Sequence, residues 1–226
     1  MPTSLDVLYE DNHLLAVAKP AMLPTMGVAA DRPSLLAVAK DYVGRKYNKP
    51  GNVYLGIVSR LDAPVTGVVL IARTSKAASR LTEQFRDREV AKVYWALVQS
   101  PPTPDSGICE DYVRKDERHR KMHVTHEQHP EAKFARLRYT TIEQARSATL
   151  LEIRLETGRK HQIRLQLAHR DLSILGDRKY GSQIAFSKGI ALHSRRIEFE
   201  HPVRKTPLCI EAPLPASWRK FGSVTR

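Results

Sequence analysis

The sequence predicts an α+β fold with a mostly antiparallel or mixed sheet, and two observations support this class. Short apolar or alternating segments recur along the chain and outnumber the segments with helical periodicity. The two kinds of segment do not alternate regularly, as they would in a doubly wound α/β fold. The chain has 226 residues, 42% of them hydrophobic, so it is long enough to bury a core.

The predicted strands combine β-prone apolar residues with flanking turn residues. They cover residues 5–9, 14–18, 54–58, 67–72, 93–98, 121–125, 133–141, 148–155, 190–199 and 207–212. Of these, residues 67–72 form an uninterrupted apolar run that is typical of a buried central strand. The proline-rich residues 101–107 form the clearest loop, but no change of composition follows them, so a single domain is expected.

Three segments have the periodicity of helices. Ser34 and Thr74 stand at the N-cap positions of the first two, where a hydroxyl accepts a hydrogen bond from an otherwise unpaired backbone N–H. The third helix is expected at residues 161–169. The apolar faces contain Leu35, Leu36, Val38, Ala39, Tyr42 and Val43 in the first, Ala78, Leu81 and Phe85 in the second, and Ile163, Leu165, Leu167 and Ala168 in the third.

The charge balance favours a polyanionic partner. Lys and Arg total 37 against 24 Asp and Glu, which gives a net charge of +13 and a pI near 9.9. A fold does not require such an excess, and its usual use is attraction to nucleic acid. A basic protein without a nucleic-acid role is the alternative. A membrane surface is less favoured, because no amphipathic helix rich in Lys and Arg stands out.

The N-terminal residues contain no signal-peptide pattern, and no apolar stretch approaches the length of a transmembrane helix. Cys109 and Cys209 are a hundred residues apart, which is neither a disulfide framework nor a paired zinc spacing. We therefore expect reduced thiols and a cytoplasmic location.

Residues 58–67 place charged side chains between two predicted strands. Arg60 and Asp62 are two positions apart, so an extended backbone would project both to the same side. A carboxylate beside a guanidinium stays ionised and can act as a base or a nucleophile. A surface ion pair followed by a turn at Ala63-Pro64 is the purely structural alternative.

A second polar segment, residues 156–164, leads into the third predicted helix. Arg159, Lys160 and Arg164 lie near the N-terminal end of that helix. Backbone N–H groups at a helix N-terminus favour anions, so the three cations predict phosphate binding. A solvated basic face is the alternative.

Aromatic and basic residues elsewhere offer further contacts to RNA. Tyr94 lies on the strand face opposite Val93 and Trp95, where it serves either core packing or stacking on a base. A basic hairpin that contacts RNA, or a plain exposed hairpin, is expected around Arg114, Lys115, Arg118, Arg120 and Lys121. The nearby His119, His123, His126 and His129 are not expected to converge on a metal.

Five motifs, in the same order along the chain, resemble those of the RluA-type pseudouridine synthases. They are Arg60-Leu61-Asp62 with Gly67, Lys92-Val93-Tyr94, Gly158-Arg159-Lys160-His161-Gln162-Ile163-Arg164, Ile174-Leu175-Gly176-Asp177 with Tyr180-Gly181, and Leu192-His193. The resemblance extends from about Leu5 to Pro213. Ser59 stands where the family has His, and Val65-Thr66 where it has Thr-Ser.

The resemblance implies a long mixed, mostly antiparallel sheet with flanking helices and a central basic cleft. It also implies one catalytic domain over residues 1–226, without a separate N-terminal RNA-binding domain, acting as a monomer. The implied activity is isomerisation of uridine to pseudouridine in transfer or ribosomal RNA, by base flipping and without a metal or other cofactor.

Asp62 would be the catalytic residue, either as a nucleophile toward the sugar or as a base toward its 2′ proton. Arg164 would pair with Asp62, Tyr94 would stack on the uracil, Ile163 and Leu192 would line the pocket, and Arg60 would enter the base stack. The other candidate RNA contacts are Arg159, Lys160, His161, Arg114, Arg118, Arg120 and Lys121.

Two other functions remain open at the level of the sequence. One is a non-catalytic RNA-binding protein, against which the joint presence of Asp62, Tyr94 and Arg164 argues. The other is a hydrolase that uses Asp62 and His161, for which neither a second carboxylate nor a metal site is evident.

Overall fold

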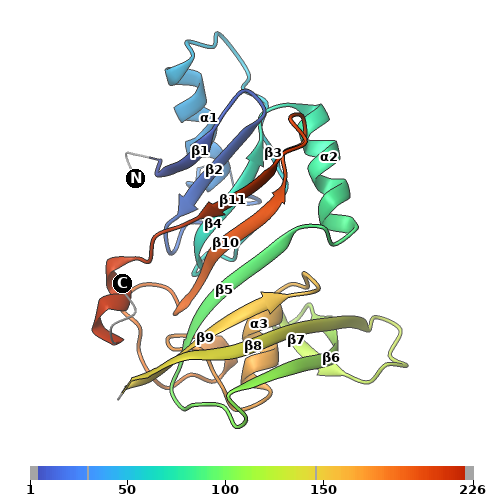
Figure 1. Ribbon diagram of the computed structural model, residues 1–226, viewed down its shortest axis with the longest axis vertical. Helices are drawn as coiled ribbons and strands as arrows, with labels where there is room; N and C mark the ends of the chain where they lie inside the picture. Colours follow the sequence, from blue (N-terminus) through green and yellow to red (C-terminus); the bar gives the residue numbers. More distant parts are fainter. Residues whose placement is uncertain (1–4, 30, 146, 222–226) are drawn as a thin grey trace. The chain divides into compact units, whose positions relative to one another are not determined.

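The computed structural model describes residues 5–29, 31–145 and 147–221 (Figure 1). The chain divides into two compact units. The first unit comprises Met1–Val90 and Ser194–Pro213, and the second comprises Ala91–His193 and Leu214–Arg226. No helix in the described part of the chain is both long and apolar enough to span a membrane.

The first unit is a sheet with two helices. Its strands are ordered β1-β2-β4-β10, with β11 beside β10 and β3 beside β4, and every register described in this unit is antiparallel. The elements are β1 (Val7–Glu10), β2 (Leu14–Lys19), α1 (Leu35–Lys46), β3 (Gly56–Ile57), β4 (Thr66–Ala72), α2 (Ser75–Arg86), β10 (Leu192–Glu200), which begins at the unit boundary, and β11 (Pro207–Glu211).

The two helices of the first unit begin where their N-cap residues predict. The side chains of Ser34 and Thr74 accept hydrogen bonds, each of 3.2 Å, from the backbone N–H groups of Ala37 and Ala77. All seven residues of β4 are buried, as the apolar run at 67–72 predicts. One core cluster joins β2, β4, α2, β10 and β11, and it includes Leu14, Leu70, Leu81, Phe199 and Ile210.

The second unit is built on five strands ordered β5-β9-β8-β6-β7, and the described registers are antiparallel. A core cluster joins β6, β7 and β8 to α3 and η1. The elements are β5 (Ala91–Val98), β6 (Ser106–Asp116), β7 (Lys121–Thr125), β8 (Lys133–Ala145), β9 (Ala148–Leu155), α3 (Gln162–Ala168) and the short 3₁₀ helices η1 (Arg178–Tyr180) and η2 (Ala216–Phe221).

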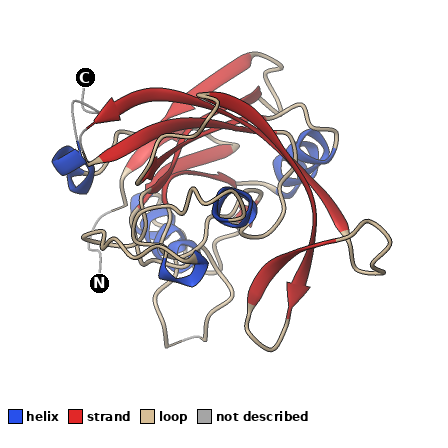
Figure 2. Cartoon of the chain, turned by 90° about the horizontal axis from the view of Figure 1, so that it is seen from below, coloured by secondary structure: helices blue, strands red, loops and turns tan. Residues whose placement is uncertain are grey.

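The predicted fold class is confirmed, because a large and mostly antiparallel sheet with few helices dominates the chain (Figure 2). One strand was missed. β6 begins inside the predicted loop at 101–107 and continues to Asp116. Its buried positions Cys109 and Val113 are separated by charged or half-buried residues, so it has no apolar run of its own.

Several predicted boundaries are wrong, and one example is the strand expected at 133–141, which continues to Ala145. The strand expected at 54–58 has only the two residues of β3, and Tyr54 is 51% exposed. The third helix begins at Gln162, because His161 has a φ of 52°, in the left-handed region that an α-helix does not use.

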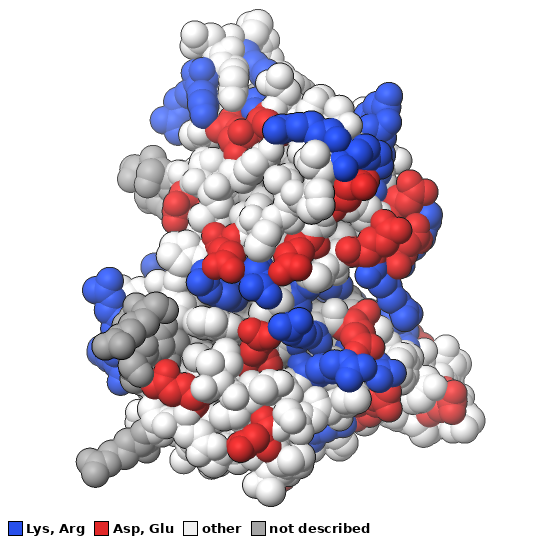
Figure 3. Space-filling view, in the orientation of Figure 1, with Lys and Arg blue, Asp and Glu red and all other residues white. Residues whose placement is uncertain are grey.

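The surface charge is mixed rather than uniform. On the face drawn in Figure 3, Lys and Arg side chains are interspersed with those of Asp and Glu. Ion pairs such as Arg138–Glu156 and Lys205–Glu200 occur on each unit. The central basic cleft that the family resemblance implies therefore stays a prediction.

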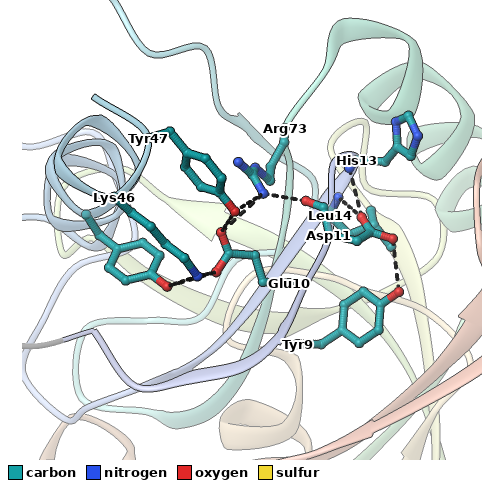
Figure 4. A network of polar contacts seen from close by, with 9 residues as sticks. Tyr9, Glu10, Asp11, His13, Leu14, Lys46, Tyr47 and Arg73 are labelled. Atoms are coloured by element: carbon teal, nitrogen blue, oxygen red, sulfur yellow. Dashed lines mark hydrogen bonds and ion pairs between the residues drawn. The ribbon is translucent and has the colours of Figure 1, made fainter. Parts of the chain in front are cut away.

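A polar network holds the connection between β1 and β2 (Figure 4). Asp11 Oδ1 accepts hydrogen bonds from the backbone N–H groups of His13 and Leu14, each at 2.8 Å, which closes the turn. The buried His201 accepts backbone hydrogen bonds at Nδ1, so its Nε2 carries the proton that is donated to Asp11 Oδ2 at 2.8 Å. Arg204 also pairs with Asp11.

Neighbouring Glu10 has its own partners. Its carboxylate accepts hydrogen bonds from Lys46 at 2.6 Å, Tyr47 at 2.8 Å and Arg73 at 3.1 Å, so it ties α1 and the end of β4 to β1 (Figure 4). Two adjacent carboxylates thus fasten this edge of the first unit.

Asp11 should make the protein sensitive to acid. Burial by itself raises the pKa of Asp11, but the hydrogen bonds from His13, Leu14, His201 and Arg204 outweigh it and hold the pKa well below its usual range. A carboxylate with a lowered pKa stabilises the folded state above the unfolded pKa, and this contribution is lost as the pH falls. The difference in unfolding free energy between wild type and Asp11→Asn should therefore become smaller as the pH falls from about 6 to about 3. The loss should begin near pH 3.9, which is about the pKa of an Asp side chain in the unfolded chain.

Urea denaturation at a series of pH values measures this difference. The exposed Asp41→Asn, which removes an exposed pair with Arg45 on α1, is the control and should show little change with pH. An Asp11→Asn difference that is the same at pH 6 and pH 3 would contradict the role of the Asp11 charge.

Candidate active site

The segment that carries Arg60 and Asp62 connects β3 to β4 in the first unit, and hydrogen bonds of the buried Thr25 and the half-buried Ser59 hold it. Thr25 Oγ1 donates to the carbonyl oxygen of Leu61 at 2.8 Å and accepts from the Leu61 N–H at 3.2 Å. Ser59 Oγ accepts from the N–H of Leu70 on β4 at 2.8 Å. Ser59, which replaces the family's usual His, therefore ties the segment to the central strand.

A buried lysine fastens the other end of this segment. Lys19 is 1% exposed, and its Nζ donates to the carbonyl oxygens of Pro20 and Leu23 at 2.8 Å and of Ala63 at 3.0 Å. Burial lowers the pKa of Lys19 to about 7, and the negative charge of Asp62 opposes that change. The three acceptors match the three N–H bonds of the charged ammonium group.

The turn predicted at Ala63-Pro64 is present, because the N–H of Val65 donates to the carbonyl oxygen of Asp62 at 3.1 Å. Gly67 follows with a φ of 111°, and a Cβ atom there would lie 2.2 Å from the carbonyl oxygen of Ser194. A side chain at this position is therefore excluded by backbone strain and by the neighbouring strand. Asp62 itself is half-buried and Arg60 is exposed.

In the second unit, α3 holds Arg164 in a buried ion pair. Arg164 Nε and Nη2 donate to the two carboxylate oxygens of Asp177 at 2.7 and 2.8 Å, and the side chains are 6% and 2% exposed. The guanidinium carbon lies 5.0 Å from the centre of the Tyr180 ring. A two-point contact of this kind sets the orientation of the guanidinium plane.

The basic residues around the start of α3 lie in different surroundings. Arg164 is buried against Asp177, whereas Arg159 Nε donates to the carbonyl oxygen of Phe134 at 2.8 Å and Lys160 is exposed. His161 Nδ1 lies 2.8 Å from the hydroxyl oxygen of Tyr180. Phosphate binding at this end of the helix stays a prediction.

Gln162 organises the turn that leads into α3. Its Oε1 accepts from Thr157 Oγ1 at 2.8 Å and from the Arg159 N–H at 2.9 Å, and its Nε2 donates to Gln166 Oε1 at 3.0 Å. Gln162 is 3% exposed, so these hydrogen bonds are formed away from water and fix the start of the helix.

The remaining candidate substrate contacts lie on β5, on α3 and at the start of β10. Tyr94 is half-buried on β5, with Ile153 of β9 opposite it in the antiparallel register. Ile163 and Leu192 are each 4% exposed. The pair expected between Asp62 and Arg164 joins residues of different units and stays a prediction.

The basic hairpin is present, with Arg114 on β6, Lys121 on β7, and Arg118 and Arg120 exposed in the turn. The expectation that its histidines do not converge is wrong for two pairs, because the ring centroids of His126 and His129 are 5.9 Å apart and His119 and His123 share a partner. His119 Nδ1 and His123 Nε2 lie 2.8 and 3.4 Å from the same Asp116 oxygen. Within the described residues, no group of three or more His, Cys, Asp or Glu has an arrangement that could hold a metal ion.

The model of the RNA pseudouridylate synthase family matches residues 13–169, which include Arg60, Asp62, Tyr94, Ile163 and Arg164. The chain belongs to this family. The resemblance to RluA-type pseudouridine synthases is thereby confirmed, and curated relatives agree with it.

Two of these relatives come from distant organisms. The chain is 36% identical to the ribosomal large subunit pseudouridine synthase D of Xylella fastidiosa, over 93% of this chain and 66% of the relative. It is 33% identical to the mitochondrial pseudouridylate synthase RPUSD4 of Xenopus tropicalis, over 95% of this chain and 78% of the relative. The chain thus spans about two thirds of the length of the bacterial relative.

A solved structure supports the fold. The structure of human RNA pseudouridylate synthase domain containing 4 superposes with a TM-score of 0.79 at 24% identity and covers 95% of this chain and 92% of that chain. The architecture of this family member therefore matches a known pseudouridylate synthase domain.

Three residues that shape the site could not be assigned a role from the sequence. They are Lys19, which follows the predicted strand at 14–18, Thr25 and Asp177. The sequence does contain one indication of the role of Lys19. This lysine ends an otherwise apolar strand, and a charged side chain that is buried there needs polar partners. Thr25 gave no signal, because its partner Leu61 is 36 positions away.

Thr25→Val should lower turnover more than it lowers RNA affinity. The change leaves the buried N–H and carbonyl groups of Leu61 without their partner, so the segment that carries Asp62 loses its fixed position. A displacement of about 1 Å in a catalytic group can cost about 10²-fold in rate. We expect a fall of that order in kcat in a pseudouridine-formation assay.

Thr25→Ser, which keeps the hydroxyl, is the matched control and should stay within a few-fold of wild type. Equal kcat values for the Val and Ser variants would show that the hydroxyl does not position the segment.

Proposed function

We propose that this chain isomerises uridine to pseudouridine in RNA, with Asp62 as the catalytic carboxylate. The observation that carries the proposal is the segment at 59–65. In a member of the RNA pseudouridylate synthase family, it presents a half-buried carboxylate on a backbone held by Lys19, Thr25 and Ser59. Rigid support of this kind is what a catalytic group requires.

The reaction rearranges one nucleotide without gain or loss of atoms. The bond between ribose C1′ and uracil N1 breaks, the uracil turns, and a bond forms between C1′ and C5. N1 then carries a proton, and the proton on C5 is removed. Asp62 acts either as a nucleophile on C1′ or as a base toward the 2′ proton, and both roles remain open. No electrons are exchanged, so the proposed chemistry needs no redox cofactor.

The other candidate residues take the following proposed roles. Arg164 keeps Asp62 ionised, and its orientation by Asp177 supports this role. Tyr94 stacks on the uracil and takes the C5 proton, while Ile163 and Leu192 line the pocket. Arg60 is exposed, so it is placed to fill the space that a flipped base leaves in the stack.

Recognition of RNA is proposed to use basic residues of a cleft and of the β6–β7 hairpin. The candidates are Arg159, Lys160, His161, Arg114, Arg118, Arg120 and Lys121. Ribosomal RNA of the large subunit is the first substrate to test, because the bacterial relative is named for it, and transfer RNA is the alternative. We propose that the protein works as a cytoplasmic monomer without a metal.

RNA labelled with tritium at C5 of uracil tests the proposal directly. Isomerisation releases tritium to water, binding alone releases none, and hydrolysis releases fragments or free base. Asp62→Asn should lower tritium release by more than about 10⁴-fold, the scale of losing a core catalytic group, while RNA affinity is kept. Asp6→Asn, at an exposed position of the same unit, should match wild type.

Substantial turnover by Asp62→Asn would reject Asp62 as the catalytic residue. Release of free uracil by the wild-type protein would identify a hydrolase, and RNA binding without any tritium release would identify a non-catalytic binding protein.

Tyr94→Phe separates the proton-transfer role of Tyr94 from packing and stacking. A phenyl ring packs and stacks as well as a phenol ring, so a residue with only those roles tolerates the change. If the hydroxyl takes the C5 proton, tritium release should fall by about 10²–10⁴-fold with unchanged melting temperature and RNA affinity.

Tyr112→Phe is the matched control, because it removes a hydroxyl bonded to Glu127 at the surface of the second unit. Turnover of Tyr94→Phe within a few-fold of wild type would leave Tyr94 with stacking or packing alone.

A further inference from the structure

The second unit contains a cavity of about 430 Å³ that is lined by none of the residues proposed to act on the target uridine, although Lys121, a proposed RNA contact, lies on it. Its wall comes from β7, from the C-terminal part of α3 and from the end of η1, and α3 contacts β7 directly. The lining residues are Lys121, Met122, His123, Val124, Leu165, Ala168, His169, Tyr180 and Gly181. This volume is within the range of about 300–1,000 Å³ that small-ligand sites occupy.

The floor of the cavity is apolar and rigid. Met122, Leu165 and Tyr180 belong to a buried core cluster, against which Val124 and Ala168 pack. The Tyr180 hydroxyl accepts the Met122 N–H at 3.0 Å and lies 2.8 Å from His161 Nδ1. The floor is therefore formed before any ligand arrives, which lowers the entropy cost of binding.

The rim is basic. Lys121 Nζ lies 4.9 Å from the centre of the Tyr180 ring, and His169 is exposed at the end of α3. His123 Nε2 lies 3.4 Å from Asp116. An apolar floor beside the Lys121 ammonium group fits a nucleobase with its phosphate.

The cavity and the candidate active site share α3 but use different positions of it. Leu165, Ala168 and His169 have the i, i+3, i+4 spacing of one helix face. Arg164 points to Asp177 instead, and Ile163 is separated from Leu165 by about 200° around the helix axis. A nucleotide in the cavity would therefore be a different one from the uridine that is isomerised.

We propose that this cavity binds one non-reacting nucleotide of the substrate RNA, with its base on the Met122–Leu165–Tyr180 floor and its phosphate at Lys121 and His169. The proposal rests on the proposed function, because it takes RNA as the substrate. The net charge of +13 supports a polyanion such as RNA as the occupant, and the base of a nucleotide can also use the apolar floor. The cavity would thus add to recognition of sequence or shape around the target uridine.

Two variants block the cavity in different ways. Ala168→Phe fills the space above the floor, and His169→Glu places a negative charge on the exposed rim without changing the core. Ala37→Phe on α1 and Gln128→Glu in the loop after β7 are the matched controls at exposed positions. Melting temperatures identify any variant that fails to fold. If Ala168→Phe fails to fold, His169→Glu alone still tests the proposal, because its substitution lies on the exposed rim.

The first measurement is affinity for large-subunit ribosomal RNA by filter binding, together with KM and kcat for tritium release. Loss of one stacked base is expected to weaken RNA affinity and raise KM by roughly 5- to 100-fold in both cavity variants, with kcat within a few-fold of wild type. The controls should match wild type. Unchanged RNA affinity and KM in both folded cavity variants would overturn the proposal.

The second measurement uses adenosine 5′-monophosphate and inorganic phosphate as probes in nuclear magnetic resonance titrations of the full chain. The nucleotide should shift the amide signals of Val124, Ala168 and Gly181, and these shifts should be absent in Ala168→Phe. Equal shifts from phosphate alone would overturn the nucleotide assignment. Nucleotide binding with unchanged RNA affinity would overturn the substrate role and indicate a site for a free nucleotide.

These readouts separate the two proposals. The absence of tritium release from the wild-type protein rejects the proposed isomerase activity. RNA affinity and the nucleotide titration reject or support the cavity independently of that result.

Discussion

The buried ammonium group of Lys19 is the interaction on which the candidate active site depends. It joins the turn after β2, through Pro20 and Leu23, to Ala63, the residue that follows Asp62. An unpaired charge in this position would be very costly, so the three carbonyl oxygens must stay in place around it. The charge of Asp62 favours the same protonated form. The lysine and the proposed catalytic carboxylate therefore stabilise each other.

The second unit uses the same principle with an arginine. Arg164 and Asp177 form a buried two-point pair, and Gln162 closes the turn that precedes them. In both units, a charged side chain is fixed by polar partners at the end of an apolar framework. Hydrogen bonds from these partners leave a side chain few alternative rotamers. They therefore hold a functional group in one position more firmly than an unsupported loop would.

Local patterns predicted the parts of the fold that local chemistry determines. The caps Ser34 and Thr74 and the buried strand β4 follow from hydroxyl placement and from an apolar run. β6 was missed, because only Cys109 and Val113 of its 11 residues are buried, so the strand has neither an apolar run nor a regular alternation of buried and exposed residues. The family motifs predicted roles for Asp62 and Arg164, and these roles stay predictions. The contacts of Lys19 and Thr25 with residues about 40 positions away arise only from tertiary structure, and no spacing rule predicts them.

Amide hydrogen exchange in Lys19→Met tests the role of this ammonium group most directly. A charged hydrogen bond contributes about 1.5–3 kcal/mol. The N–H groups of Leu61 and Val65 should therefore exchange at least about tenfold faster than in wild type, while the amides of β4 stay protected. Lys40→Met, at an exposed position of α1, should leave all of these rates unchanged. Wild-type protection of Leu61 and Val65 in a folded Lys19→Met protein would contradict the account.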